Sequence, residues 1–180
     1  MDHLVGTLCA LHDRGDHGLI SIRPAARADN DAIWRILEPT LRAGETYPQS
    51  RDITRDAALA YWWSPTHAIF VAEDENGHVN ATYYLKANTG GPGSHVANCG
   101  YMTLPRAWGH GVGRALCLHS LDEARRRGFR AMQFNLVIST NARALHLWQS
   151  CGFGIVGRLP GAFEHPTQGF VDALILFQTL

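Results

Sequence analysis

The fold is decided by residues Trp108 to Leu116, which read Trp-Gly-His-Gly-Val-Gly-Arg-Ala-Leu. They follow a strand-like run at residues 95–104 and open a helical pattern. Glycine has no Cβ, so successive N–H groups of Gly109, Gly111 and Gly113 can turn toward one point. The start of the following helix adds its partial positive charge. The stretch therefore predicts a cradle for an anion, such as a phosphate group of a cofactor.

The spacing of these glycines does not match the two best-known phosphate-binding motifs. Dinucleotide folds require Gly-x-Gly-x-x-Gly in an early βαβ unit, whereas this chain has Gly109-x-Gly111-x-Gly113 near its middle. A P-loop requires Gly-Lys-Ser/Thr, which does not follow here. A glycine-rich turn that binds no ligand therefore remains an alternative to the anion cradle.

The composition is that of a globular domain, with 46% hydrophobic and 18% charged residues among 180. We expect an N-terminal tail at residues 1–18 and a single domain at residues 19–180. The formal net charge is zero, which removes the electrostatic argument for a nucleic-acid partner. No apolar run approaches the roughly 20 residues of a membrane helix, and the N-terminus lacks the basic start of a secretory signal. We therefore predict a cytoplasmic protein without membrane contact.

The four cysteines lie at positions 9, 99, 117 and 151, without Cys-x-x-Cys spacing. The histidines and cysteine of the tail also fit no zinc pattern. We interpret the cysteines as free thiols and predict no metal site.

Periodicity and turn signals predict alternating strands and helices. Asp29 should cap a helix that carries Ile33, Ile36 and Leu37 and ends at Pro39, and a second helix should run from Thr54 to Trp63. The turn at residues 74–78 should join two strands as a hairpin. The order predicts an α/β protein with one mixed sheet. The further expected elements are strands at 19–23, 68–73, 79–86, 95–104, 131–138, 154–159 and 171–177, a helix from the glycine loop to Gly128, and a helix at 141–151.

A second motif follows the glycine loop. Asn141 is followed by Ala144-Leu-His-Leu-Trp-Gln-Ser-Cys-Gly-Phe153. Together with the glycine loop, this pattern resembles the GNAT superfamily of acetyl-CoA-dependent N-acetyltransferases. The resemblance covers residues from about 19 to the C-terminus. It implies a central sheet of about seven strands flanked by about four helices, with strands 4 and 5 splayed apart beside the coenzyme.

Further stretches are similar to one bacterial and fungal branch of that family. They include Gly44-Glu-Thr-Tyr47, Ser94-His-Val-Ala-Asn98 and Met132-Gln-Phe-Asn135. That branch includes yeast enzymes that acetylate the proline analogue azetidine-2-carboxylate. The resemblance implies acetyl transfer from acetyl-CoA to the amine of a small molecule, an amino or imino acid or a related amine, by direct attack in a ternary complex.

The resemblance also implies which residues form the site. The coenzyme arm should add to the backbone of a strand like a further strand, and N–H groups near Met102 should polarise the thioester carbonyl. Asn98 and Asn135 are polar positions in apolar strands and should contact the acceptor as the candidate catalytic residues, with Tyr47 as a third substrate contact. The coenzyme residues are Tyr101, Met102, Thr103, Leu104, Trp108, Gly109, His110, Gly111, Val112, Gly113, Arg114, Ala115, Asn141 and Trp148.

Two positions depart from the family pattern. Trp108 stands where the family usually has Gln or Arg, and Trp148 stands where many relatives have a tyrosine that acts as a general acid. Because the indole N–H is a very poor acid, we interpret Trp148 as a packing residue beside the coenzyme. Cys99 could form an acyl-enzyme, but it has no evident basic partner in the sequence, so a core thiol is the preferred interpretation.

Two other functions remain open. The chain could acetylate a protein N-terminus or lysine, although the long segments at residues 41–53 and 87–94 look able to cover an open acceptor groove. It could also be a non-catalytic coenzyme-binding module, for which the missing tyrosine is the support. The resemblance further suggests a homodimer through the last two strands.

Overall fold

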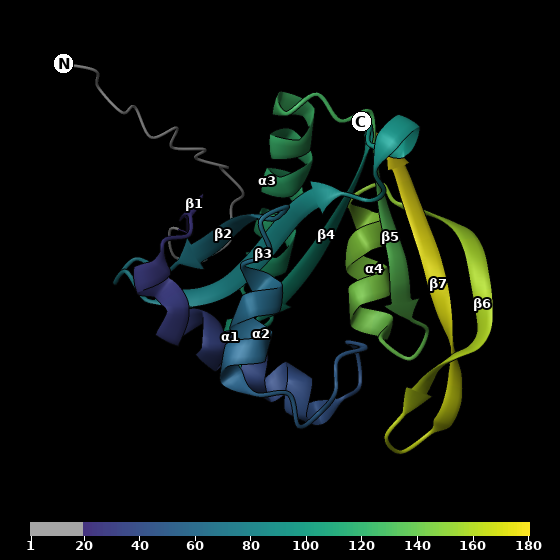
Figure 1. Cartoon of the computed structure of the whole chain (residues 1–180), viewed down its shortest axis with the longest axis horizontal. Helices are drawn as coiled ribbons and strands as arrows, with labels where there is room; N and C mark the ends of the chain where they lie inside the picture. The colour runs from purple at the N-terminus through teal and green to yellow at the C-terminus, as the bar shows by residue number, and fades with distance from the viewer. Residues whose placement is uncertain (1–19) are drawn as a thin grey trace.

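The computed structural model describes residues 20–180, and Figure 1 shows the arrangement of their helices and strands. Seven strands form one sheet in the order β1-β2-β3-β4-β5-β7-β6. The predicted mixed α/β fold is confirmed, and the predicted tail at residues 1–18 lies outside the described residues. The strands are β1 Ser21–Pro24, β2 Ala68–Glu73, β3 Val79–Ala87, β4 Val96–Thr103, β5 Ala131–Ile138, β6 Gly154–His165 and β7 Gly169–Thr179, and the helices are α1 Asn30–Ala43, α2 Arg55–Trp62, α3 Val112–Arg126 and α4 Ala142–Ser150.

The sheet opens between β4 and β5. These strands are parallel, and their register contains only the pairs Val96↔Ala131 and Ala97↔Met132. Every other neighbouring pair of strands is antiparallel. Beyond Ala97 the two strands diverge, so main-chain groups of the second half of β4 face an opening rather than a partner strand. The predicted splay between the fourth and fifth strands is therefore present.

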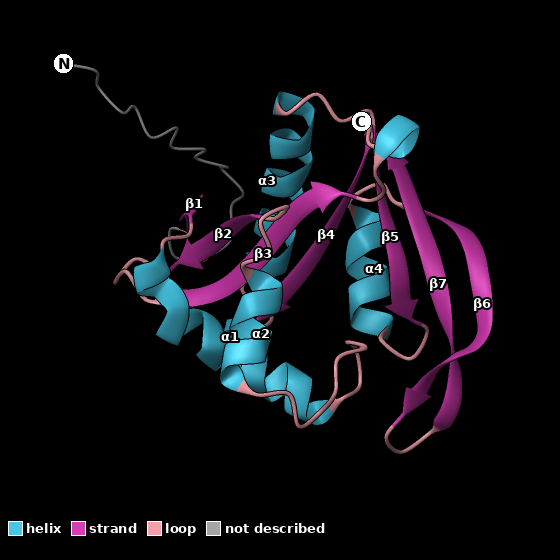
Figure 2. Ribbon diagram, in the orientation of Figure 1, coloured by secondary structure: helices cyan, strands magenta, loops and turns pink. Residues whose placement is uncertain are grey.

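Helices cover both faces of the sheet (Figure 2). Side chains of α1 and α2, including Trp62, pack with Tyr84 and Met102 on one face. Side chains of α3, including Leu116, pack with Tyr83 and the second half of the sheet on the other face. The alternation of side chains along each strand divides the core in this way. No helix of the described residues is long and apolar enough to cross a membrane.

The first helix extends beyond its predicted end. The prediction that it stops at Pro39 is wrong, because α1 runs to Ala43 and ends at Gly44, whose φ is 67°. Proline removes one helical N–H donor, which costs stability. The added turn buries Leu41 in the same cluster as Ile36, and this burial offsets the lost hydrogen bond.

The position of Asp29 at the start of α1 is as predicted, but its carboxylate does not cap the helix. It accepts hydrogen bonds from the N–H of Ala26 at 2.7 Å and from two guanidinium nitrogens of Arg23, each at 2.8 Å. The side chain therefore ties the helix start back to β1 instead.

The last two strands are longer than the sequence indicates. Pro160 and Gly161 suggest an end to the sixth strand, yet β6 continues to His165. The register between β6 and β7 shifts between Leu159 and Phe163, so a bulge absorbs both residues. Proline is tolerated there because β6 is an edge strand of the sheet. The resulting hairpin forms the edge of the sheet opposite β1 (Figure 2).

Candidate functional site

The predicted glycine loop leads directly from β4 into α3. Gly109 and Gly111 have φ values of 80° and 74°, in the left-handed region that favours glycine. Gly111 is the N-cap residue of α3, no side chain caps this helix, and its first turn contains no acidic residue. The N–H groups at the start of α3 are therefore available to an anion, and this geometry fits a phosphate group.

The third residue of the motif, Gly113, must be glycine for a different reason. A Cβ built on Gly113 would lie 3.0 Å from Cδ2 of Leu147, which belongs to α4. Gly113 thus permits the close approach of α3 and α4, and the first two glycines shape the cradle.

A cation lies beside the glycine loop although position 108 is a tryptophan. The guanidinium carbon of Arg143, at the start of α4, lies 3.7 Å from the ring centroid of Trp108. The indole Nε1 of Trp108 donates to Oγ1 of Thr103 at 3.0 Å, which fixes the ring. Arg106 is not free for this role, because it donates to Oδ1 of Asn80 at 2.9 and 2.6 Å. Sequence reasoning missed Arg143, because no local pattern connects it with Trp108.

The main-chain N–H and C=O groups of β4 point alternately toward β3 and toward the opening beside β5. Leu104 N–H donates to the carbonyl of Asn80 at 2.9 Å, and the carbonyl of Val96 accepts from Asn88 N–H at 2.8 Å. Even-numbered residues of β4 therefore direct their N–H and C=O groups toward β3. Odd-numbered residues direct theirs toward the opening beside β5.

This alternation specifies which groups near Met102 face the opening. N–H groups near Met102 were expected to polarise the thioester carbonyl; the main-chain groups of Met102 itself face β3, and its side chain is buried against α1 and α2. Next to Met102, the groups that face the opening belong to Tyr101 and Thr103. The carbonyl of Tyr101 already accepts a hydrogen bond of 2.9 Å from the hydroxyl of Tyr47.

The two predicted asparagines lie together at the start of the opening. Asn98 is buried, and its Nδ2 donates to the carbonyl of Gln133 at 2.9 Å and to Oδ1 of Asn88 at 3.3 Å. Asn135 is exposed, and its Nδ2 donates to the same Oδ1 of Asn88 at 2.7 Å. The prediction did not include Asn88 and Gln133, because contacts across 35 to 47 positions leave no local signal.

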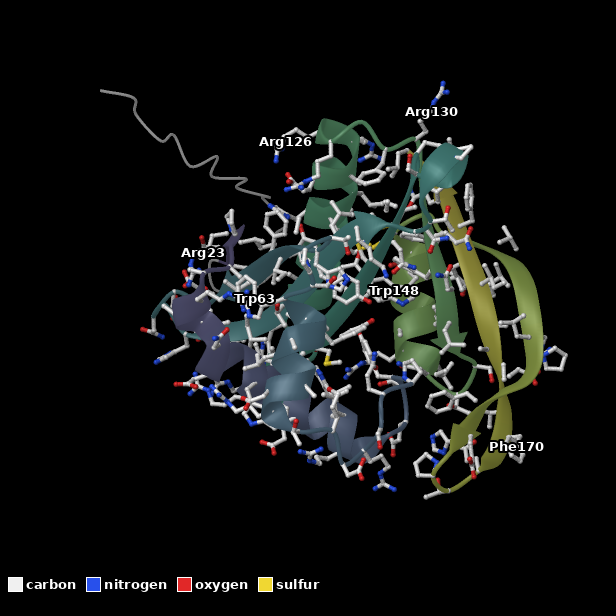
Figure 3. All side chains as sticks on the ribbon, in the orientation of Figure 1. Arg23, Trp63, Arg126, Arg130, Trp148 and Phe170 are labelled. Atoms are coloured by element: carbon white, nitrogen blue, oxygen red, sulfur yellow. The ribbon has the colours of Figure 1, made fainter. Side chains whose placement is uncertain are left out.

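Trp148 bridges the opening from the side of α4 (Figure 3). Its ring centroid lies 4.8 Å from that of Tyr101 on β4 and 5.1 Å from that of Phe134 on β5. The hydroxyl of Tyr101 shares a 2.6 Å hydrogen bond with Oγ of Ser120, and burial raises the pKa of Tyr101 well above its ordinary value. This phenol is therefore poorly suited to release a proton.

Asn141, which is predicted to bind the coenzyme arm, caps α4 in the structure. Its Oδ1 accepts from the N–H of Ala144 at 3.1 Å and so caps α4. The carboxamide nitrogen of Asn141 remains for a ligand at the same edge of the sheet.

Cys99 is a buried thiol beside Tyr101. Burial raises its pKa to about 12, so the group is protonated near neutral pH. This supports the interpretation of Cys99 as a core residue. Within residues 20–180 no group of three or more metal-ligating side chains is placed to hold an ion.

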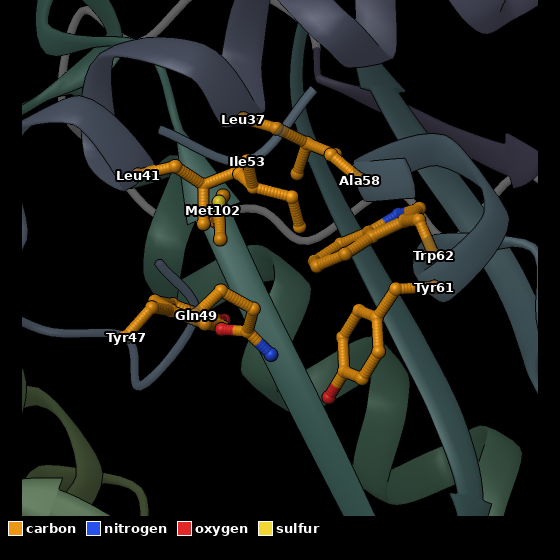
Figure 4. Close-up of a pocket in the computed structure, with 9 residues that line it drawn as sticks. All are labelled: Leu37, Leu41, Tyr47, Gln49, Ile53, Ala58, Tyr61, Trp62 and Met102. Carbon is orange, nitrogen blue, oxygen red and sulfur yellow. The ribbon is translucent and has the colours of Figure 1, made fainter. Parts of the chain in front are cut away.

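A small cavity lies between the loop after α1 and helix α2 (Figure 4). Its volume is about 10 Å³, enough for about one water molecule. Tyr47 and Gln49 enter it from the loop and face Tyr61 of α2 (Figure 4). The Oε1 atom of Gln49 is buried and accepts no hydrogen bond from the described residues. The lining residues are Leu37, Leu41, Tyr47, Gln49, Ile53, Ala58, Tyr61, Trp62 and Met102.

Comparison with known proteins agrees with this geometry. The model of the acetyltransferase (GNAT) family matches residues 30–153. The N-acetyltransferase aca1 of Schizosaccharomyces pombe is 31% identical over 156 residues, which cover 75% of this chain and 72% of that protein. The structure of a GCN5-related N-acetyltransferase from Kribbella flavida is similar with 41% identity and a TM-score of 0.85, covering 89% of this chain and 98% of that one.

A further similar structure is that of the acetyltransferase YncA from Salmonella typhimurium with its cofactor acetyl-CoA. It has 26% identity and a TM-score of 0.78, and the match covers 89% of this chain and 94% of that one. The resemblance first found in the glycine loop and the Asn141–Phe153 motif is thus confirmed. The chain belongs to the acetyltransferase (GNAT) family and is an acyltransferase.

Proposed function

We propose that the protein transfers the acetyl group of acetyl-CoA to the amine of a small molecule, an amino or imino acid or a related amine. The observation that carries the proposal is the pair Asn98 and Asn135 at the opening between β4 and β5. The loop after α1 covers the adjacent edge of β4 through the bond from Tyr47 to Tyr101. Such a covered site suits a small acceptor better than a protein segment.

The coenzyme would be held by residues at the end of the opening. Main-chain N–H groups of residues 109–115 suit the pyrophosphate, with Arg143 as an additional cation. The main chain of Tyr101 and Thr103 suits the amide groups of the coenzyme arm, and Trp148 forms an apolar wall. When bound, acetyl-CoA supplies the activated acetyl thioester.

The acceptor side of the opening carries amides and one cation. Lys86 lies directly opposite Asn98 in the register of β3 and β4, so both side chains share one face of the sheet. None of the ion pairs among the described residues involves Lys86. An unpaired cation beside two carboxamides supports an acceptor that carries an anionic group near its amine.

The residues of the site favour direct attack. Holding both substrates in one site makes the attack effectively intramolecular, and this accounts for much of the expected rate. N–H groups of Tyr101 or Thr103 can stabilise negative charge on the acetyl oxygen. No enzyme nucleophile is required, which agrees with the high pKa of Cys99. Trp148 has no acidic proton, so we assign protonation of the released thiolate to water, which also takes up the proton that the amine loses on becoming an amide.

The test is an acetyl-transfer screen that detects released thiol. The acceptors are amino acids, imino acids, simple amines, peptides with free N-termini and lysine peptides, with a reaction lacking acceptor as the hydrolysis control. We expect turnover with small amines that carry an anionic group. Preference for peptides would favour the protein-acetylation alternative, and binding of acetyl-CoA without turnover would favour a non-catalytic module. Absence of calorimetric heat with acetyl-CoA would contradict the coenzyme assignment itself.

We also propose a homodimer through the hairpin of β6 and β7. This hairpin exposes Ile155, Val156, Leu159 and Phe170, whose exposed fractions are 47%, 63%, 38% and 76%. Phe170 projects from the turn end of the hairpin (Figure 3). Light scattering after size exclusion should give twice the 19.9 kDa chain mass, and Val156→Asp should return the monomer mass. A monomer at micromolar concentration would contradict this proposal.

A further inference from the structure

Four carboxamide-bearing residues form a closed ring of hydrogen bonds at the point where β4 and β5 separate. Gln133 Nε2 donates to Oδ1 of Asn135 at 2.8 Å, and Asn135 Nδ2 donates to Oδ1 of Asn88 at 2.7 Å. Asn98 Nδ2 donates to the same Oδ1 of Asn88 at 3.3 Å and to the main-chain carbonyl of Gln133 at 2.9 Å. The ring therefore begins and ends at Gln133.

One group sets the direction of every bond in this ring. A main-chain carbonyl can only accept, so the nitrogen of the Asn98 side chain must face Gln133. The second hydrogen of that nitrogen requires an acceptor, which is Oδ1 of Asn88. Because Asn88 presents its oxygen, Asn135 must present its nitrogen to it, and its own oxygen then faces Gln133 Nε2. The orientation of all four carboxamides follows from one carbonyl group.

The ring leaves one atom of Asn98 unused. Both hydrogens of Asn98 Nδ2 are engaged, whereas no described residue donates to its Oδ1. Asn98 lies one position beyond the last β4–β5 pair, Ala97↔Met132. The free oxygen therefore belongs to the residue at which the opening begins.

We propose that Asn88 is a positioning residue of the transfer reaction. Its Oδ1 holds the carboxamides of Asn98 and Asn135 so that Asn98 Oδ1 accepts an N–H of the acceptor amine. This proposal rests on the proposed function. A neutral amine attacks with its lone pair, and an acceptor for its N–H restricts the direction of that lone pair. Asn88 acts only through its two neighbours and does not touch the amine.

The main-chain contacts of Asn88 argue against a purely structural role for its side chain. Asn88 N–H already bonds to the carbonyl of Val96 at 2.8 Å, and this bond does not depend on the side chain. The segment after β3 thus stays attached to β4 when the side chain is replaced. What the half-buried side chain of Asn88 contributes is to orient the carboxamides of Asn98 and Asn135.

The experiment compares Asn88→Asp with Asn88→Leu. Aspartate keeps an oxygen that can accept from both Asn98 and Asn135, whereas leucine has a similar size and no acceptor. We expect kcat/KM for the acceptor to fall about 100-fold in N88L and less than about 10-fold in N88D, whose carboxylate keeps both hydrogen bonds but repels an anionic acceptor. The Kd for acetyl-CoA and the Tm should stay near wild type in both variants. Asn76→Leu, in the exposed turn between β2 and β3, is the matched control for an added leucine.

Side-chain amide NMR on the enzyme without acceptor provides a second measurement. The NH₂ signals of Asn98 and Asn135 should be dispersed and protected in wild type and N88D, and averaged in N88L. Unchanged amide signals in N88L overturn the ring. Equal loss of kcat/KM in both variants overturns the positioning role. A wild-type enzyme that acetylates no small amine overturns the proposed function, and with it the positioning role, while the NMR result still decides whether the ring exists.

Discussion

The hydroxyl of Tyr47 donates a 2.9 Å hydrogen bond to the main-chain carbonyl of Tyr101, which joins the loop after α1 to the open edge of β4. Burial raises the pKa of Tyr47, so the hydroxyl stays protonated and remains a donor. The carbonyl of Tyr101 faces away from β3, and without Tyr47 it would lack a protein partner at this edge. The loop after α1 and strand β4 are thus physically coupled by a single side chain.

Removing this hydroxyl should loosen the loop. We expect Tyr47→Phe to lose about 1 kcal/mol of local stability and to raise KM for the acceptor. Hydrogen exchange of residues 45–50 should become faster, as measured by mass spectrometry. Tyr61→Phe is the matched control, because Tyr61 bonds to the hydroxyl of Tyr84 at 3.2 Å instead. Unchanged exchange in Y47F would show that the bond does not hold the loop.

Trp148 should act through packing. Since its ring contacts Tyr101 and Phe134, Trp148→Phe should retain most of the wild-type turnover. Trp148→Ala should lower the free energy of unfolding by about 2–3 kcal/mol, since half-buried aromatic contacts are lost. Urea unfolding and steady-state kinetics measure the two effects. A folded W148F enzyme that binds acetyl-CoA without turnover would instead assign Trp148 a chemical role.

Arg143 should contribute to coenzyme binding. Arg143→Ala should raise the Kd for acetyl-CoA roughly 10-fold by calorimetry, the loss of about one charge-assisted hydrogen bond. Arg125→Ala, at the other end of α3, is the control and should leave the Kd unchanged. Equal Kd values for R143A and wild type would limit Arg143 to its contact with Trp108.

The ion pair of Asp29 and Arg23 should make stability depend on pH. The Arg23 guanidinium holds the pKa of Asp29 below its ordinary value near 3.9, so folding favours the ionised carboxylate. Its contribution is present above that ordinary pKa and is lost as pH falls through the lower pKa of the folded state. Asp29→Asn should therefore cost about 1–3 kcal/mol at pH 7 and less at pH 3.

Urea unfolding at several pH values measures this difference. Asp122→Asn provides the comparison, because the pair of Asp122 with Arg125 lies on the exposed surface of α3. A D29N deficit that stays constant with pH would contradict the ionic explanation.

Local patterns account for the parts of the fold that the sequence predicts well. Largely apolar runs on either side of the turn around Gly77 predict β2 and β3, and Thr54 caps α2 through the N–H of Ala57 at 3.2 Å. The glycine loop is predictable because Gly109 and Gly111 meet a local backbone demand, their positive φ.

The remainder depends on contacts between distant residues. Pro39 indicates a helix end, and only the burial of Leu41 reveals why the helix continues. Asn88 lies in a stretch that looks like a simple loop, yet it meets Asn135 47 positions later. The sequence indicates only an exposed helical residue at Arg143, whereas in the folded structure its guanidinium packs on the ring of Trp108. The role of each of these side chains depends on contacts with residues that are distant in the sequence.

The alternation along β4 also limits how such an enzyme can evolve. Insertion of one residue after Ala97 would reverse the pleat of the rest of the strand. The main-chain groups now facing the opening would turn to β3, and the ring of Tyr101 would move out of its aromatic cluster. A one-residue change in the length of this strand therefore disturbs main-chain groups and core together, whereas the loop residues 48–54 and 89–95 can change in number without altering the register of β4. New acceptor preferences should arise by remodelling those loops around a strand of invariant length.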